Sequence, residues 1–73
     1  MSYGYTPRID SLNQKADQSL LGVRLGRVCI DNDVSVTEMA SQLGVSRQTI
    51  YNWFVGFHEP NNELTAYVEA LIS

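Results

Sequence analysis

The sequence has little of the material from which metal sites, disulfides and membrane spans are built. Its 73 residues include one cysteine, Cys29, and one histidine, His58. One cysteine cannot form an internal disulfide, and a structural zinc site takes about four ligands, so we expect no metal and no cofactor. No apolar run approaches the ~20 residues of a transmembrane helix. The first ten residues lack the basic and apolar regions of a secretory signal, which indicates a cytoplasmic protein without a membrane partner.

Length and charge narrow the function classes further. A domain of this size buries only roughly 60% of the surface that its unfolded chain exposes, which leaves no room for a deep, water-excluded cleft. We therefore expect that the protein is not an enzyme. Basic residues are also scarce, with five Lys and Arg against eight Asp and Glu and a net charge of −3. A nucleic-acid-binding domain usually has a basic face, so this balance counts against tight DNA binding.

Residues 1–16 show no sustained apolar periodicity, and we interpret them as a flexible N-terminal arm. Thr6 followed by proline is a common helix start, so a short helix or turn over residues 7–15 is compatible with the pattern. Tyr3 and Tyr5 either belong to a fraying terminus or become ordered against a partner, because exposed tyrosines suit interfaces.

The most specific pattern lies in the middle of the chain. Ser35 and Glu38 form a capping box at the start of one helix, and Gly44 is placed to end that helix with a left-handed turn. Ser46 can cap a second helix over 46–55, which Gly56 ends. Two helices joined by a short turn that contains glycine form a helix-turn-helix.

Helical patterns flank this motif. Apolar positions at helical spacing predict a helix from Asp17 to Ile30, and a last helix should follow Pro60. Gly22 and Gly26 lie one turn apart, and each weakens a helix by ~1 kcal/mol, so they indicate close approach of another helix. We predict an all-α fold of four to five short helices around a central helix-turn-helix, with 17–73 as the domain.

The stretch SVTEMASQLGVSRQTIYNWFVGFHEP resembles the Cro/repressor-type helix-turn-helix family. The resemblance implies a helix at 46–55 that enters the major groove of an operator with its N-terminal side chains at base edges. The implied base-contacting residues are Arg47, Gln48, Tyr51 and Asn52; the alternative is that Arg47, Gln48 and Asn52 form an ordinary solvated helix face. The matching positions are Ala40, Gly44, Val45, Ser46, Ile50, Trp53, Gly56 and Pro60.

The residues around and after Arg47 fit DNA poorly. No lysine or arginine follows it, and the acidic side chains that do follow would repel a phosphate backbone. The end of the second motif helix is also unusually apolar. Its residues either form an exposed patch, which usually marks a protein interface, or Phe57 packs against the last helix. The patch residues are Tyr51, Val55, Phe57 and His58.

Small phage-encoded transcription regulators that bind the host RNA polymerase are similar to this chain in size and acidity. That resemblance implies a cytoplasmic protein of the bacterial host, monomeric or weakly dimeric, that contacts polymerase to inhibit initiation and/or suppress termination. Two other functions stay open: a Cro-like repressor that binds operator DNA, and an interaction domain that holds another regulator. The residues expected to bind a partner are Tyr3, Tyr5, Tyr51, Val55, Phe57, His58, Glu59, Glu63 and Glu69.

Overall fold

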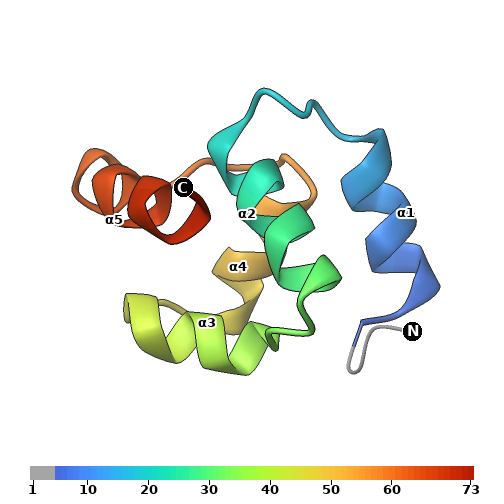
Figure 1. Ribbon diagram of the computed structural model, residues 1–73, viewed down its shortest axis with the longest axis horizontal. Coiled ribbons are helices and arrows are strands. Elements are labelled where there is room, and N and C mark those ends of the chain that lie inside the picture. Colours follow the sequence, from blue (N-terminus) through green and yellow to red (C-terminus); the bar gives the residue numbers. More distant parts are fainter. Residues whose placement is uncertain (1–4) are drawn as a thin grey trace.

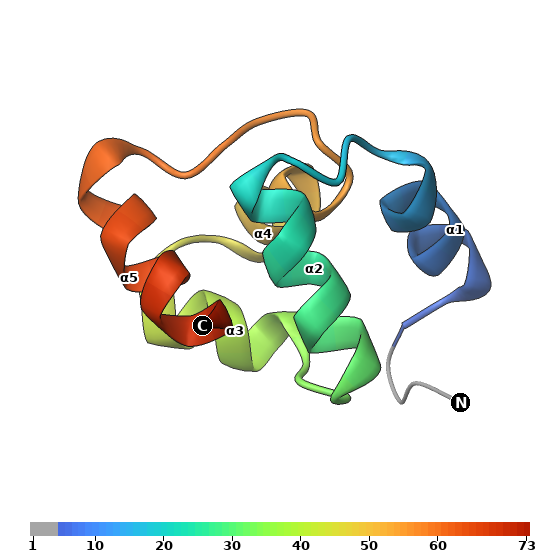
Figure 2. The same cartoon turned by 45° about the horizontal axis from the view of Figure 1, so that its top comes forward.

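The helices of the computed structural model, which describes residues 5–73, surround one central helix, α2. α1 and α5 lie on opposite sides of α2 in both views (Figures 1 and 2). α3 and α4 lie below α2 in Figure 1, and Figure 2 shows α4 behind α2. The described residues form five helices and no strand, which confirms the all-α prediction. None of these helices is long and apolar enough to cross a membrane. The helices are α1 (Pro7–Lys15), α2 (Leu21–Asp31), α3 (Val36–Leu43), α4 (Arg47–Phe54) and α5 (Asn62–Ile72).

Side-chain caps fix most of the helix starts. The Ser35 and Ser46 hydroxyls accept hydrogen bonds from the amides of Glu38 and Thr49, as predicted for the starts of α3 and α4. Gly44 ends α3 with a φ of 69°, which also confirms the expected left-handed turn. α2 begins at Leu21 rather than at Asp17, because the Asp17 carboxylate accepts hydrogen bonds from the Ser19 amide and hydroxyl and so forms a separate turn.

The two glycines of α2 lie directly against α4. A Cβ atom built at Gly22 would lie 2.7 Å from the Cβ of Trp53, and one built at Gly26 would lie 2.8 Å from the Cγ of Phe54. This confirms the predicted close approach of a second helix. Trp53 and Phe54 are buried in the core that this contact creates. The spacing of α2 and α4 therefore depends on two positions that lack side chains.

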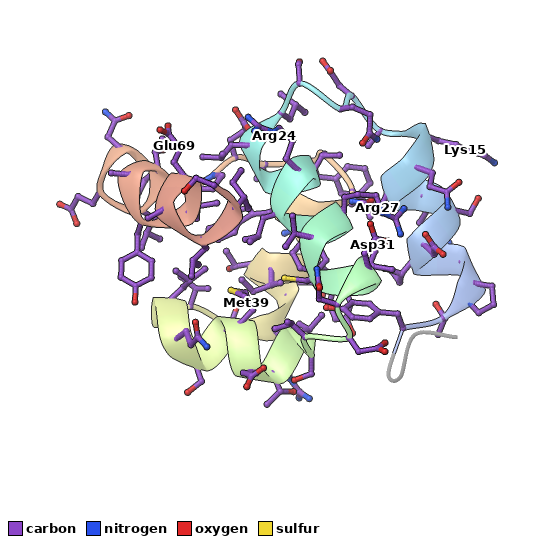
Figure 3. The ribbon with its side chains drawn as sticks, in the orientation of Figure 1. Lys15, Arg24, Arg27, Asp31, Met39 and Glu69 are labelled. Carbon is purple, nitrogen blue, oxygen red and sulfur yellow. The ribbon has the colours of Figure 1, made fainter. Side chains whose placement is uncertain are left out.

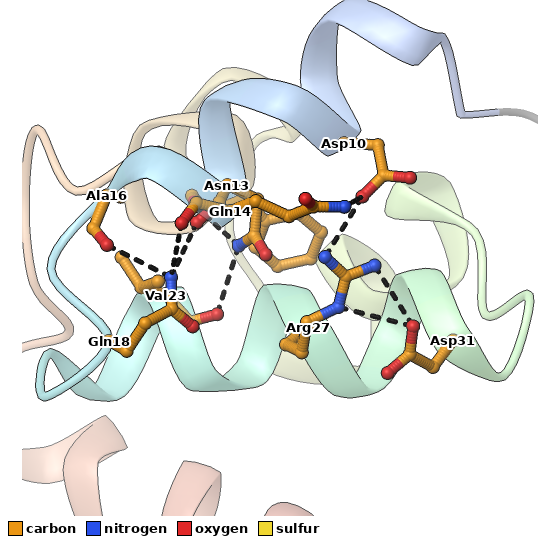
Figure 4. A network of polar contacts seen from close by, with 9 residues as sticks. Asp10, Asn13, Gln14, Ala16, Gln18, Val23, Arg27 and Asp31 are labelled. Carbon is orange, nitrogen blue, oxygen red and sulfur yellow. Dashed lines mark hydrogen bonds and ion pairs between the residues drawn. The ribbon is translucent and has the colours of Figure 1, made fainter.

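α1 packs on the domain, which differs from the arm expected over residues 1–16. The side chain of Asn13, on α1, is fully buried. Its Nδ2 atom donates to the carbonyl oxygen of Val23 in α2 at 3.0 Å and to that of Phe54 in α4 at 2.7 Å (Figure 4). The Gln18 amide donates to carbonyls at the C-terminal end of α1. Buried amide groups persist when they find such partners, so α1 is joined to both α2 and α4.

The expected exposure of Tyr5 is wrong. Its side chain is only 8% exposed, its hydroxyl donates to the carbonyl of Val34, and its ring centroid lies 6.2 Å from that of Phe54. Burial raises the pKa of the Tyr5 phenol, with smaller contributions from nearby negative charges. Tyr5 thus belongs to the core and is not accessible to a partner. Tyr3, the other expected arm residue, lies outside the described residues.

The buried thiol of Cys29 predicts a loss of stability at alkaline pH. Burial raises its pKa from 9.0 to about 11, with a smaller effect of the charge on Glu38. The folded state therefore holds its proton more tightly than the unfolded state between pH 9 and pH 11. The stability contribution is constant below pH 9 and falls as pH rises toward 11, by about 2 kcal/mol in total.

Urea unfolding at intervals from pH 8 to pH 11 measures this loss. Cys29→Ala should be less stable at every pH because it leaves a cavity, but its stability should fall less steeply above pH 9. Tyr5→Phe serves as the control. The buried Tyr5 phenol also has a raised pKa, so it too lowers stability as pH rises, and this variant removes that second contribution. Identical slopes for the wild type and Cys29→Ala contradict the assignment to the thiol.

Candidate interaction surfaces

The four residues implied as base-contacting all lie on α4. Arg47 and Gln48 are exposed, whereas Tyr51 and Asn52 are half-buried. The Gln48 side-chain amide donates to the Asn52 side-chain oxygen at 3.1 Å, as residues four apart on a helix can. The structure therefore brings these residues together on one helix, and two of them are already bonded to each other.

α1 forms a wall opposite this face of α4. The space between the two helices, here called the α1–α4 groove, has a volume of about 480 Å³. Gln48, Tyr51 and Asn52 all line it, so three of the four expected DNA-contacting residues face a groove within the protein. The other lining residues are Thr6, Arg8, Ile9, Leu12, Val55 and Phe57.

Phe57 projects outward beside this groove. It is 76% exposed, so the alternative in which it packs against the last helix is wrong. The amides of Phe57 and His58 both donate to the Asn52 carbonyl, and Gly56 has a φ of 85°, which turns the chain sharply after α4. Val55 is half-buried and His58 is exposed. Of the four expected patch residues, Tyr51, Val55 and Phe57 line the groove, whereas His58 does not.

Sequence analysis missed the α1 side of the groove. Ile9 and Leu12 supply its apolar wall, and Leu12 is 40% exposed. Their spacing of three residues is a helical signal, and Thr6-Pro7 marked the helix start correctly. Nothing in the local pattern says that α1 lies against α4, because the buried bond of Asn13 to Phe54 spans 41 residues.

The expected acidic residues lie on the other side of α2. Glu63 and Glu69 belong to α5 and are exposed. Glu59 has a structural contact, since its carboxylate accepts from the Gly22 amide at 3.4 Å near the start of α2, where Leu20 supplies no side-chain cap. Glu59 and Glu69 line a shallow pocket of about 440 Å³ with Arg24. Figure 3 labels the Glu69 side chain on α5 and the Arg24 side chain on α2.

Most charged side chains on these two surfaces form no ion pair with another described residue. Between described residues, ion pairs form only at Arg27, which binds Asp10 at 2.9 Å and Asp31 at 3.0 Å. Arg8, which lines the groove, and Arg47, at the start of α4, have no described carboxylate as ion-pair partner. Glu63 and Glu69 on α5 have no described cation as ion-pair partner. Both faces therefore carry charges that are available to a partner.

The described part of the chain contains no cluster of side chains that could bind a metal ion. No three side chains of His, Cys, Asp or Glu come together there. Cys29 is buried in the core and His58 lies alone on the surface. The candidate sites are accordingly the α1–α4 groove and the side of the molecule formed by α5, here called the acidic face of α5, where Glu63 and Glu69 are exposed.

Comparison with known proteins adds no relative to this description. The chain matches no model of a protein family, no curated protein and no solved structure.

Proposed function

We propose that the protein is a phage-type transcription regulator that binds the RNA polymerase of a bacterial host directly and so inhibits initiation and/or suppresses termination. The observation that carries this proposal is the acidic face of α5, where Glu63 and Glu69 are exposed and have no described cation as ion-pair partner. A protein of this size with a net charge of −3 and such a face suits a basic protein surface.

The basic surfaces of polymerase are those where nucleic acid enters and leaves. An acidic protein is attracted to them over about a Debye length, ~8 Å at physiological salt, and its association rate falls as salt rises. Occupying such a surface blocks or redirects the path of nucleic acid. Binding through an acidic face can in this way change initiation or termination.

DNA binding is the alternative function, as a Cro-like repressor whose α4 reads an operator. The observation in its favour is the exposure of Arg47 and Gln48 at the N-terminal end of α4, where a recognition helix presents its base contacts. Firm DNA complexes make roughly 6–10 phosphate contacts, and Arg47 is the one basic residue of α3 and α4. The α1 wall beside Gln48 and Asn52 also restricts access to base edges.

Capture of tagged protein from a nuclease-treated bacterial lysate tests the proposal, with purified polymerase as the quantitative follow-up. Glu63→Gln and Glu69→Gln should each weaken polymerase binding by a factor of about 1.4 to 5 at low salt, because an exposed ion pair contributes ~0.2–1 kcal/mol. Glu38→Gln on α3 is the matched control, since it removes one charge from a different face and should leave binding unchanged. Equal weakening by all three variants, or none, contradicts the assignment to α5.

Arg47→Ala separates the two functions. If α4 reads DNA, the substitution should cost ~1–3 kcal/mol of operator binding in a low-salt shift assay. We expect instead no measurable DNA binding by either form and unchanged polymerase capture. Retention of a different host or phage regulator, with no polymerase, would identify the chain as an interaction domain.

A further inference from the structure

We propose that the α1–α4 groove binds an amphipathic helix of another protein, one that carries apolar side chains along one face and carboxylates beside them. This goes beyond the function proposed above, because it concerns a different surface with the opposite charge preference. It holds whether or not the partner of the acidic face is polymerase.

The shape and lining of the groove fit apolar side chains. Ile9 and Leu12 of α1 face Tyr51 and Val55 of α4, and Phe57 stands at the rim with three quarters of its surface exposed. A volume of about 480 Å³ lies within the usual range for binding clefts, about 300–1,000 Å³. A trough between two helices is also the form that receives a third helix through anchors spaced i, i+3, i+4 and i+7.

Charge around the groove is positive although the chain is acidic. Arg8 lines the groove, and no carboxylate of the described residues does. Arg47 is not among the lining residues, but it is exposed at the N-terminal end of α4, one position before Gln48. The nearby acidic groups are engaged elsewhere: Asp10 of α1 accepts from Gln14 at 3.0 Å and pairs with Arg27, and Glu59 contacts the start of α2. An occupant that carries carboxylates beside its apolar face would pair with both arginines.

A protein helix fits this lining better than a nucleic acid does. Two arginines supply too few phosphate contacts for useful affinity. Single-stranded nucleic acid binds through aromatic side chains that stack on successive bases, whereas three of the five apolar side chains that line this groove are aliphatic. Gln48 and Asn52 are bonded to each other, which leaves fewer of their polar atoms for base edges.

The test uses the full chain and a labelled synthetic helix of about sixteen residues, with leucine at i, i+3, i+4 and i+7 and glutamate at the flanking positions. Fluorescence anisotropy measures its binding at low salt. The same peptide with lysine in place of glutamate should bind at least tenfold more weakly. Phe57→Ser should weaken binding of the glutamate peptide about tenfold, and Arg8→Glu about fivefold, with the second effect shrinking at high salt.

Tyr67→Ser is the matched control, because Tyr67 is an exposed aromatic residue on α5, on the opposite side of α2. It should leave binding unchanged, and thermal unfolding should be similar for all three variants, whose residues are exposed. Three outcomes overturn the proposal: no binding of the glutamate peptide at 1 mM, lysine and glutamate peptides of equal affinity, or equal losses in Phe57→Ser and Tyr67→Ser. Tighter binding of a labelled single-stranded oligonucleotide that Phe57→Ser abolishes would assign the groove to nucleic acid instead.

Discussion

Gly22→Ala is expected to lower the free energy of unfolding by about 2–3 kcal/mol, the cost of overpacking at a close helix contact. The added Cβ would lie 2.7 Å from the Cβ, 2.9 Å from the carbonyl oxygen and 3.0 Å from the Cα of Trp53. These atoms belong to or adjoin the backbone of α4, so no side-chain rotation relieves the contact. α4 has to move away from α2, which loosens the core around Trp53.

Helix propensity alone predicts that Gly22→Ala raises the free energy of unfolding. Alanine favours a helix over glycine by ~1 kcal/mol, so a Gly22 that only lowered helix stability would be improved by it. Urea unfolding followed by the fluorescence of Trp53 gives the sign directly. Ser41→Ala, an exposed change on α3, is the control and should shift stability by less than about 0.5 kcal/mol. A Gly22→Ala variant as stable as the wild type would show that α2 and α4 are not tightly apposed.

The local parts of the fold could be predicted because their causes lie within a few residues of one another. Ser35 and Ser46 cap amides three positions along, and Gly44 has no Cβ to oppose a left-handed turn. Even the α2–α4 contact left a local trace, since Gly22 and Gly26 make sense only if another helix is close. Such signals fix where helices begin and end.

The position of α1 could not be predicted, because its causes are distant in the sequence. Asn13 is polar and lies on a mostly polar helix, which indicates a surface position. It is buried because its amide meets carbonyl oxygens 10 and 41 residues away. The Tyr5 hydroxyl likewise bonds to a carbonyl 29 residues away. Helical periodicity compares residues three and four apart, so it carries no information about these contacts.

The residues of the candidate site also divide into those that local sequence signals predict and those whose packing depends on distant contacts. The α4 residues were found because they belong to a motif, and Phe57 was found because it is apolar just after a helix end. The two interpretations of Phe57, an exposed patch residue or a residue packed on the last helix, differ only in its contacts with distant residues. The sequence pattern is the same for both, and the structure shows that Phe57 is exposed. Once α1 is in place, three of the four residues that resemble a DNA-contacting face, Gln48, Tyr51 and Asn52, become one wall of a groove.

Asn13→Asp is the second large effect, about 3 kcal/mol or more at neutral pH, because it places an unpaired charge in the core. The substitution keeps the shape of the side chain. It replaces the Nδ2 donor, which bonds to Val23 and Phe54, with an oxygen that faces two carbonyl oxygens. Asn13 Oδ1 has no hydrogen-bond partner among the described residues, so no second contact compensates.

The pH dependence of Asn13→Asp identifies the cause. Burial raises the pKa of the introduced carboxyl above its unfolded value, so stability is constant below that value and falls as pH rises. Urea unfolding should therefore show a smaller loss at pH 3, where the neutral carboxyl can donate one hydrogen bond, than at pH 7. Gln14→Ala, an exposed change on the same helix, should cost less than about 0.5 kcal/mol at both.

Hydrogen exchange shows where that stability is lost. The amides of α1 should exchange faster in Asn13→Asp, while those of α3 and α4 keep most of their protection, because α1 is joined to the domain through few buried groups. Equal losses at pH 3 and pH 7, or uniform exchange along the chain, would contradict this account. Since α1 is one wall of the α1–α4 groove, a detached α1 should also abolish binding of the glutamate peptide and leave Glu63 and Glu69 on α5 in place.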